Sequence, residues 1–319
     1  MTDVVIIGGG GVVGQKLARA LVARGSLKGA PVGRITLADI VQPAPVEGTE
    51  GVVCDITDPG SVAAAIPDGT DVIYHLAAVV SAHAEAEFDE GWAINLGGTR
   101  NVLDRARALG TAPVLVFTSS IAVYGGAAAD PLGDHSYPNP QTSYGAQKAI
   151  GEIMVNDWSR KGFVDGRAVR LPTISVRPGR PNRAASGFMS SILREPLNGQ
   201  VAVCPVGRDY LHYYLSPRKC VENLIRVAEI PAETLGVNRV LQMPGRRWSI
   251  GDLVDALEAV AGPEAVRLIR WEDDPDLRRI LDGWRHDIHA DRAEALGLEA
   301  DASFEENVRY YIEDDRPAP

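Results

Sequence analysis

A glycine-rich turn follows the first apolar segment of this chain and constrains its fold more than any other feature. The apolar run Val4–Ile7 leads directly into Gly8-Gly9-Gly10-Gly11-Val12-Val13-Gly14, and a helical pattern continues to Arg24. Glycines at this spacing let the chain turn tightly, bring backbone N–H groups against a pyrophosphate and pack the helix close to the strand. The motif therefore predicts a dinucleotide-binding unit. The alternative is that the glycines only allow the chain to turn and bind no ligand. The predicted cofactor contacts here are Gly8, Gly11, Val12, Val13 and Gly14.

Short apolar strands alternate with helical segments through the first half of the chain. The alternation predicts an α/β fold, a Rossmann doubly wound parallel sheet with a smaller C-terminal substrate lobe. We expect strands at Val4–Ile7, Ile35–Ala38, Val72–Leu76, Val114–Thr118 and Ala168–Thr173, and helices at Val13–Arg24, Trp92–Leu109 and Tyr144–Trp158. Further along, we expect helices at Ser216–Ala228 and Ser249–Val260, the latter with Ser249 as N-cap, and strands at Arg239–Met243 and Leu268–Trp271.

The composition of the chain changes after Pro172, which predicts a division into two parts. We expect residues 1–172 to form the dinucleotide-binding Rossmann domain, with 205–243 returning to it. Residues 173–204 and 244–319 would then form the substrate-binding lobe. The stretch Val176–Pro196 is rich in proline, glycine and arginine, and we expect irregular structure over a site there.

The second predicted strand is followed by Asp39, where a carboxylate can accept hydrogen bonds from both ribose hydroxyls of a dinucleotide. The same carboxylate would repel a 2′-phosphate, and the next three residues, Ile40, Val41 and Gln42, supply no cation. The position therefore favours NAD over NADP as the cofactor. The alternative is that Asp39 only caps the end of the strand.

Tyr144 and Lys148 are four residues apart on a predicted helix, so both side chains project from one face, and Ser120 ends a strand upstream. A phenol is a poor base at neutral pH, and lowering its pKa by ~3 units takes about 4 kcal/mol of extra stabilisation of the phenolate. A lysine ammonium and a positively charged nicotinamide ring together can supply it. We predict that Ser120 holds the substrate oxygen, that Tyr144 takes the hydroxyl proton and that hydride passes to the nicotinamide.

The net charge and the cysteines indicate which partners the protein can bind and in which cell compartment it lies. The chain has 42 acidic and 32 basic residues, a net charge of −10, which argues against a nucleic-acid partner because phosphate binding needs a concentrated basic surface. The three cysteines lie far apart, and no run reaches the ~18 apolar residues needed to span a bilayer. We expect a cytoplasmic protein without membrane contact. We also expect no metal site, since His286 and His289 lack a clear third ligand.

Several motifs, in this order along the chain, resemble the extended short-chain dehydrogenase/reductase family. The glycine turn is followed by His75-Leu76-Ala77-Ala78, Asn95-Leu96-Gly97-Gly98-Thr99, Ser119-Ser120-Ile121-Ala122-Val123-Tyr124-Gly125, Tyr144-Gly145-Ala146-Gln147-Lys148 and Arg208-Asp209-Tyr210-Leu211-His212. One departure is Ile7, which stands where the family usually has threonine. The resemblance implies NAD as cofactor, catalysis by Ser120, Tyr144 and Lys148, and a homodimer formed through the helices Trp92–Leu109 and Tyr144–Trp158.

The resemblance also assigns further cofactor contacts. It implies that Asp55 and Ile56 lie at the adenine, and that Leu171, Pro172 and Thr173 hold the nicotinamide end. The other contacts that it implies are Leu76, Ala77, Ala78, Asn95 and Thr118, together with Tyr144 and Lys148.

Residues 170–199 resemble the branch of this family that oxidises D-erythronate at C2. Arginines in a proline-stiffened loop could hold a carboxylate in a bidentate clamp and set the neighbouring hydroxyl against Tyr144. The predicted function is therefore NAD-dependent oxidation of the C2 hydroxyl of a small sugar acid, D-erythronate, to its 2-oxo acid. The predicted substrate contacts are Arg177 and Arg180 at the carboxylate, with Ser81, Ser119, Ser120, Tyr144 and Thr173. Solvent-facing or ion-paired arginines are the alternative.

Two other functions stay open. A nucleotide-sugar 4-epimerase would use the same cofactor and the same three side chains. A dehydratase is disfavoured, because Ile121 and Ala122 stand where such enzymes carry an Asp-Glu pair. A non-catalytic NAD sensor has no use for an acidified phenol, so the intact trio of Ser120, Tyr144 and Lys148 argues against it.

Overall fold

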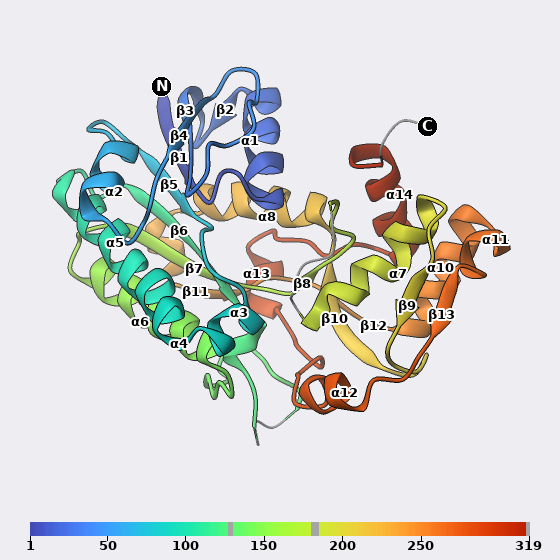
Figure 1. Cartoon of the computed structure of the whole chain (residues 1–319). Helices are drawn as coiled ribbons and strands as arrows, with labels where there is room; N and C mark the ends of the chain where they lie inside the picture. The colour runs from blue at the N-terminus through green and yellow to red at the C-terminus, as the bar shows by residue number, and fades with distance from the viewer. Residues whose placement is uncertain (127–129, 180–184, 317–319) are drawn as a thin grey trace.

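A largely parallel sheet forms the centre of the larger part of the molecule (Figure 1). The structure is a computed structural model that describes residues 1–126, 130–179 and 185–316. In this part of the chain the sheet has eight strands in the order β11-β7-β6-β5-β1-β3-β2, with β4 also paired to β3. Its strands are β1 (Thr2–Ile7), β2 (Ser26–Leu27), β3 (Ala30–Asp39), β4 (Glu50–Val53), β5 (Val72–His75), β6 (Val114–Ser120), β7 (Asp165–Leu171) and β11 (Val240–Gln242).

Helices cover both faces of this sheet, which confirms the predicted α/β fold with a doubly wound sheet (Figure 1). One face carries α1 (Val12–Arg24), α8 (Pro217–Glu229) and α13 (Asp291–Ala295); the other carries α2 (Pro59–Ala65), α5 (Thr99–Ala108) and α6 (Ser143–Arg160). Each face has its own apolar core, because the central strands are apolar on both sides. Short helices α3 (Ser81–Ala86), α4 (Phe88–Gly91), η2 (Ile121–Val123) and α9 (Ala232–Leu235) connect these elements.

The predicted helix Trp92–Leu109 consists of two different helices. Its first part, η1 (Trp92–Gly98), is a π-helix, and α5 continues from Thr99. Apolar spacing does not distinguish the two types of helix, so this feature was outside the reach of the sequence pattern. Such π segments are frequent at functional sites.

A smaller lobe lies beside the sheet and has a separate apolar core (Figure 1). Its sheets are β12-β10-β8 and β13-β9, made of β8 (Thr173–Ile174), β9 (Ala202–Cys204), β10 (Leu211–Leu215), β12 (Arg246–Ser249) and β13 (Ile269–Trp271). Its helices are η3 (Ala185–Gly187), α7 (Phe188–Leu197), α10 (Ile250–Ala261), α11 (Pro263–Val266), α12 (Pro275–Leu281) and α14 (Phe304–Asp314). Ser249 caps α10 as expected and shares a capping box with Asp252.

The expectation of irregular structure throughout Val176–Pro196 is wrong. Helix α7 begins at Phe188, and Met189, Ile192 and Leu193 are buried in the core of the lobe. Their spacing is helical, and Pro196 lies in the last turn, one residue before the helix ends at Leu197. Apolar burial therefore outweighs the helix-breaking composition of this stretch.

Residues 205–243 are divided between the two parts of the molecule. Strand β10 pairs with β8 and β12 in the sheet of the lobe, whereas α8 packs on the main sheet and β11 extends it. We therefore propose that the return of the chain to the larger domain begins at Pro217 rather than at residue 205.

Candidate active site

The glycine turn between β1 and α1 has the geometry of a cradle for a bound group. Gly8 has a φ of +88°, and a Cβ there would lie 2.7 Å from the backbone nitrogen of Ala77. A Cβ on Gly14 would overlap the carbonyl oxygen of Gly8. These two glycines are therefore required by contacts within the protein itself.

Gly11 differs from these two glycines. Its φ of −74° is open to any residue, and a Cβ would meet only Gly8 O at 3.4 Å. It is the N-cap of α1, and no side chain caps the helix there. The first N–H groups of α1 and the positive end of its dipole lie at this end of the helix, and the space beside Gly11 is open, which fits a dinucleotide pyrophosphate.

The carboxylate of Asp39 binds the turn directly. It accepts hydrogen bonds from the backbone N–H of Gly10 (2.9 Å) and of Ile40 (2.8 Å). The capping role is thus present, and a carboxylate has further lone pairs that can accept bonds from a ribose. The two interpretations of Asp39 are compatible with each other.

The loop after β5 packs against the glycine turn. The N–H groups of Leu76 and Ala77 both donate to the carbonyl of Ile7, at 2.8 and 3.1 Å. Asn95 fixes Val79, two residues after Ala77, by accepting from its N–H (2.9 Å) and donating to its carbonyl (3.1 Å). Asn95 Nδ2 also donates to Gln147 Oε1 (2.7 Å) on α6. In this structure Asn95 therefore holds the loop and the helix together.

The predicted adenine contacts lie in a turn after β4. Asp55 Oδ1 accepts from both the N–H and the hydroxyl of Thr57, and its side chain is exposed. Ile56 is buried and packs where a Cβ on Gly98 would be. Asn101 on α5 donates to the carbonyl of Ile56 at 2.9 Å and keeps this turn in place.

Ser120, Tyr144 and Lys148 meet at the end of β6. Helix α6 begins at Ser143, capped by the hydroxyl of Thr142, and so Tyr144 lies in its first turn and Lys148 in its second. Tyr144 shares a hydrogen bond with Ser120. Lys148 is 3% exposed, donates to the carbonyl of Thr118 at 2.7 Å and lies 5.7 Å from the centre of the Tyr144 ring.

Burial is the main influence on the pKa values of Tyr144 and Lys148. It raises the pKa of Tyr144 to about 12, against a smaller opposing effect of the bond with Ser120. It lowers the pKa of Lys148 to about 7, although the negative charge of Glu152 opposes that change. The Lys148 ammonium is bonded to Thr118 O at 2.7 Å. The expectation that Lys148 and a bound nicotinamide ring together lower the pKa of the phenol stays a prediction.

The two neighbouring serines have different partners. The side chain of Ser119 is buried and donates to Glu152 Oε1 at 2.6 Å, whereas Ser120 bonds with Tyr144. The catalytic role of Ser120 and the substrate contact of Ser119 stay predictions. Glu152 and its partner Arg170 were not predicted from the sequence, although Glu152 follows Lys148 by one helical turn.

The chain enters the lobe directly beside Ser120. Leu171 is the register partner of Ser120 across β6 and β7, so Pro172 and Thr173 come immediately after the trio. The hydroxyl of Thr173 lies 2.7 Å from Nε2 of His212, a buried histidine on β10 whose pKa burial lowers to about 3. His212 is the last residue of one of the family motifs. The sequence does not reveal its contact with Thr173, because the two residues are 39 positions apart.

Arg177 is a partly buried cation without an acidic partner among the described residues. Its guanidinium contacts Ser186 Oγ at 3.5 Å, and burial together with the charge of Arg194 lowers its pKa. Arg194 donates to the carbonyl of Arg177 at 2.9 Å and pairs with Glu195 at 2.6 Å.

The predicted contact Arg180 lies outside the described residues. Ser81 begins α3, after the loop that Asn95 holds.

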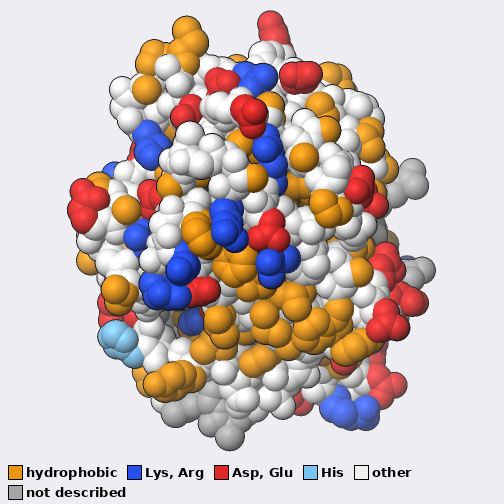
Figure 2. Space-filling model, turned by 90° about the vertical axis from the view of Figure 1, so that its left-hand side faces the viewer, with side chains coloured by type: hydrophobic (Ala, Val, Ile, Leu, Met, Phe, Trp, Pro, Cys, Tyr) orange, Lys and Arg blue, Asp and Glu red, His pale blue; other side chains and the backbone are white. Residues whose placement is uncertain are grey.

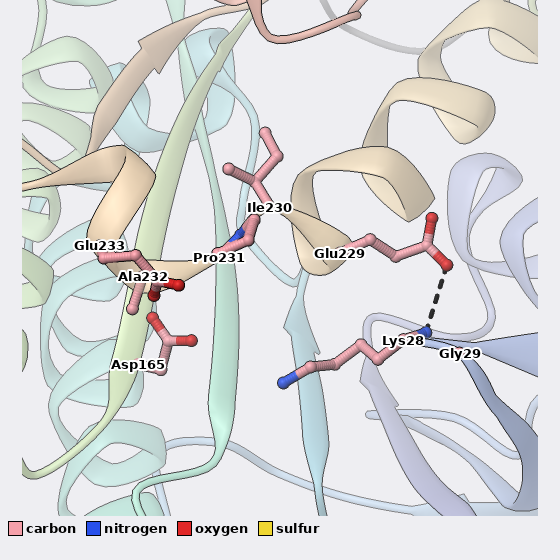
Figure 3. A pocket seen from close by; sticks show the side chains of 8 residues that line it. All are labelled: Lys28, Gly29, Asp165, Glu229, Ile230, Pro231, Ala232 and Glu233. Carbon is pink, nitrogen blue, oxygen red and sulfur yellow. Dashed lines mark hydrogen bonds between the residues drawn. The ribbon is translucent and has the colours of Figure 1, made fainter.

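A pocket shown in Figure 3 lies elsewhere. It is lined by residues of the β2–β3 turn, the start of β7 and the end of α8, including Lys28, Asp165 and Glu229. Asp165 begins β7, whereas Ser120 ends the neighbouring parallel strand, so the pocket and the trio lie at opposite edges of the sheet. Ligands of open α/β sheets bind at the carboxyl edge, where the trio lies.

Within the described ranges, no three His, Cys, Asp or Glu side chains gather to hold a metal ion.

The comparisons with known proteins agree with this geometry. The sequence model of the NAD-dependent epimerase/dehydratase family matches residues 4–214, from the first strand through the trio to β10. The chain belongs to this family. Membership in the NAD-dependent epimerase/dehydratase family confirms the predicted extended short-chain dehydrogenase/reductase relationship and NAD as the cofactor.

Within the NAD-dependent epimerase/dehydratase family, two curated relatives have the same name. The D-erythronate dehydrogenase of Cupriavidus necator is 46% identical over 318 residues, 98% of either chain. The D-erythronate dehydrogenase of Haemophilus influenzae is 38% identical over 315 residues, 98% of this chain and 99% of its own. A solved structure from Agrobacterium tumefaciens, named as a nucleoside-diphosphate-sugar epimerase, is 46% identical with a TM-score of 0.94 and covers 98% of this chain and 94% of that chain. In the described part of the chain, no helix has the length and apolar character needed to cross a membrane.

Proposed function

We propose that this protein is an NAD-dependent dehydrogenase that oxidises the C2 hydroxyl of D-erythronate to 2-oxo-D-erythronate. The observation that carries the proposal is the identity of 46% and 38%, over nearly full lengths, to two enzymes named D-erythronate dehydrogenase. The juxtaposition of Ser120, Tyr144 and Lys148 at the end of β6 supports it, because alcohol oxidation needs a base at the hydroxyl.

The proposed mechanism divides the reaction between cofactor and chain. Bound NAD supplies the acceptor for the hydride that leaves C2. Ser120 donates a hydrogen bond to the substrate oxygen and holds the C2 hydroxyl against Tyr144. Tyr144 accepts the hydroxyl proton as the carbonyl forms, and Lys148 stabilises the charge that this step creates. Because the pKa of Tyr144 is raised by burial to about 12 despite the opposing bond with Ser120, the positive charges around the phenol are essential to its role as a base.

We propose that NAD binds across the glycine turn with its ribose at Asp39 and its adenine at Asp55 and Ile56. The uncapped N-terminus of α1 supports a pyrophosphate there. The loop of Leu76, Ala77 and Ala78, held by Asn95, would line the middle of the cofactor, with Thr118 on its path. Pro172 and Thr173 would lie at the nicotinamide, next to the trio. In the turn we propose the contacts expected from the sequence, Gly8, Gly11 and Gly14, with Val12 and Val13 supplying N–H groups.

We propose that Arg177 holds the carboxylate of the substrate. A guanidinium that is partly buried and has no acidic partner among the described residues carries a desolvation cost, which a bound carboxylate would offset. Arg194 supports it by fixing the backbone of Arg177. Ser81 and Thr173 are proposed as additional polar contacts of the sugar acid.

We further propose a homodimer formed through α5 and α6. Figure 2 shows hydrophobic side chains gathered over one face of the molecule. Ile153 on α6 is 67% exposed and Phe88 on the neighbouring α4 is 55% exposed. Exposed apolar patches of this kind mark interaction surfaces.

A cytoplasmic location is proposed as well, supported by three cysteines that are all free thiols.

The direct test is a panel of four- and five-carbon aldonates with NAD, followed by the absorbance of NADH. We expect turnover with D-erythronate, and less with aldonates of other length or configuration. An enzyme that reduces NAD with none of these acids would contradict the proposal. Replacing NAD by NADP should lower kcat/KM by ~10-fold or more, because the carboxylate of Asp39 repels a 2′-phosphate.

A nucleotide-sugar epimerase is the second candidate, favoured by the 46% identity to the Agrobacterium tumefaciens protein named as a nucleoside-diphosphate-sugar epimerase. This activity would keep NAD tightly bound through purification and would convert a UDP-hexose without net NADH formation. An assay of UDP-glucose and UDP-galactose interconversion separates the two candidates.

A further inference from the structure

A buried ion pair lies directly behind the catalytic trio. Glu152 on α6 is 3% exposed and Arg170 on β7 is 7% exposed. Arg170 donates to both carboxylate oxygens of Glu152, from Nε to Oε1 at 2.8 Å and from Nη2 to Oε2 at 2.6 Å. Two parallel bonds of this kind hold both groups in a fixed orientation.

Each member of the pair has a second partner near the trio. Ser119, the neighbour of Ser120, donates to Glu152 Oε1 at 2.6 Å, and it is also the register partner of Arg170 across β6 and β7. Arg170 Nη1 donates to the hydroxyl of Tyr124 at 2.6 Å, just after the turn that Ser120 caps. The pair therefore ties α6 to the end of β6 and to β7 at the depth where Tyr144 meets Ser120.

Glu152 lies one helical turn beyond Lys148, so both side chains leave the same face of α6, and both are buried there. Its negative charge opposes the effect of burial on Lys148. The other titratable groups around Lys148 are Tyr144 on α6 and His75 on β5, which burial keeps neutral, and Arg170 lies behind Glu152. Glu152 is the acidic side chain that acts on Lys148.

We propose that Glu152 is a positioning residue for the reaction, which holds Lys148 in its ammonium form and fixes the end of β6 through Ser119. Arg170 is the support of that carboxylate. The proposal rests on the proposed function for its catalytic meaning, but the charge of Lys148 can be measured without any turnover.

The test is a carbon-13 NMR titration of the full-length protein labelled at the lysine ε-carbon. The chain has only five lysines, and the spectrum of Lys148→Met assigns the signal. In the parent we expect the Lys148 ammonium to titrate with a pKa of about 7. In Glu152→Gln the midpoint should fall by ~0.5 pH unit or more, because the charge that favours the ammonium is gone.

Ser119→Ala is the matched control. It removes a hydrogen bond to the same carboxylate but leaves the negative charge, so the Lys148 midpoint should stay within ~0.2 pH unit of the parent. Equal shifts in Ser119→Ala and Glu152→Gln would overturn the proposal, because packing rather than charge would then explain both. An unchanged midpoint in Glu152→Gln would overturn it as well.

Glu152→Gln leaves Arg170 buried without its partner and can fail to fold. The double variant Glu152→Gln with Arg170→Met removes both charges and leaves no unpaired ion. A smaller downward shift of the Lys148 midpoint is expected there, because loss of the Arg170 charge favours the ammonium and partly offsets the loss of Glu152. No downward shift in the folded double variant contradicts the proposal.

Activity gives a second readout when the parent oxidises a hydroxy acid. Because the ammonium is lost as pH rises through the pKa of Lys148, a lower pKa moves the alkaline fall of kcat to lower pH by the same amount in Glu152→Gln. No turnover by the parent counts against the proposed substrate class only, whereas an unchanged NMR midpoint counts against the role of Glu152 only.

Discussion

At the scale of single residues, Tyr144 is the group on which the proposed chemistry depends. Tyr144→Phe removes the proton acceptor and keeps the ring, so kcat should fall by ~10²- to 10⁴-fold. Binding of NAD, measured by calorimetry, should stay within ~2-fold of the parent, since the phenylalanine keeps the ring and most of the proposed cofactor contacts lie elsewhere in the chain. Loss of NAD binding together with turnover would show a structural role for the phenol instead.

Arg177 is the residue that should decide recognition of the acid. Arg177→Ala should raise KM for D-erythronate by ~10- to 100-fold with a smaller change in kcat, because a charge-assisted contact to the ground state is lost. Arg177→Lys should fall between the parent and Arg177→Ala, since it keeps the charge but not the fork of donors.

Arg160→Ala is the control for Arg177. Arg160 is an exposed arginine at the end of α6, paired with Asp157 at 2.6 Å, and its removal should leave KM unchanged. Steady-state kinetics of the three variants and the parent check the prediction. If Arg177→Ala binds the acid as the parent does, the carboxylate is held elsewhere.

At the scale of the element, substitutions in the turn between β1 and α1 can distinguish an effect on folding from an effect on cofactor binding. Gly11→Ala adds a methyl group that meets only Gly8 O at 3.4 Å. We expect a thermal midpoint close to the parent and an NAD Kd at least ~10-fold higher, because the added methyl group stands where the pyrophosphate approaches the helix.

Gly14→Ala is the comparison within the same turn. Its methyl group would overlap the carbonyl oxygen of Gly8, so both the thermal midpoint and NAD affinity should fall. Calorimetric unfolding and NAD titration of the two variants check this pair. Equal NAD affinity in Gly11→Ala and the parent would exclude the cofactor from the end of α1.

At the scale of the whole molecule, local patterns predicted the larger part of the fold and the chemical trio. The strands beside the glycine turn and the helix of Tyr144 and Lys148 are visible in periodicity, because their apolar faces are continuous in the sequence. The Ser249 cap of α10 is visible as well. Each of these features depends on residues within a few positions of each other.

Features that depend on distant partners were not predictable in this way. Glu152 and Arg170 are 18 residues apart, on a helix and a strand, and neither position shows the pairing by itself. The bond of Thr173 to His212 spans 39 residues and depends on how β8 and β10 pair. Helix α7 was missed because Pro196 and the glycines weighed more in the pattern than the burial of Ile192, which depends on the lobe core.

The proposed assembly is also a property of the whole molecule. Size-exclusion with light scattering should give twice the chain mass of 34.1 kDa for the parent at micromolar concentration. Ile153→Glu places a charge in the apolar face of α6 and should shift the protein to the monomer, because an unpaired charge at an interface centre is costly to desolvate. Ile280→Glu is the matched control, since Ile280 is 54% exposed on α12 of the smaller lobe. A monomeric parent would contradict the proposed dimer. An Ile153→Glu variant that stays dimeric, as Ile280→Glu should, would place the contact on another face of the molecule.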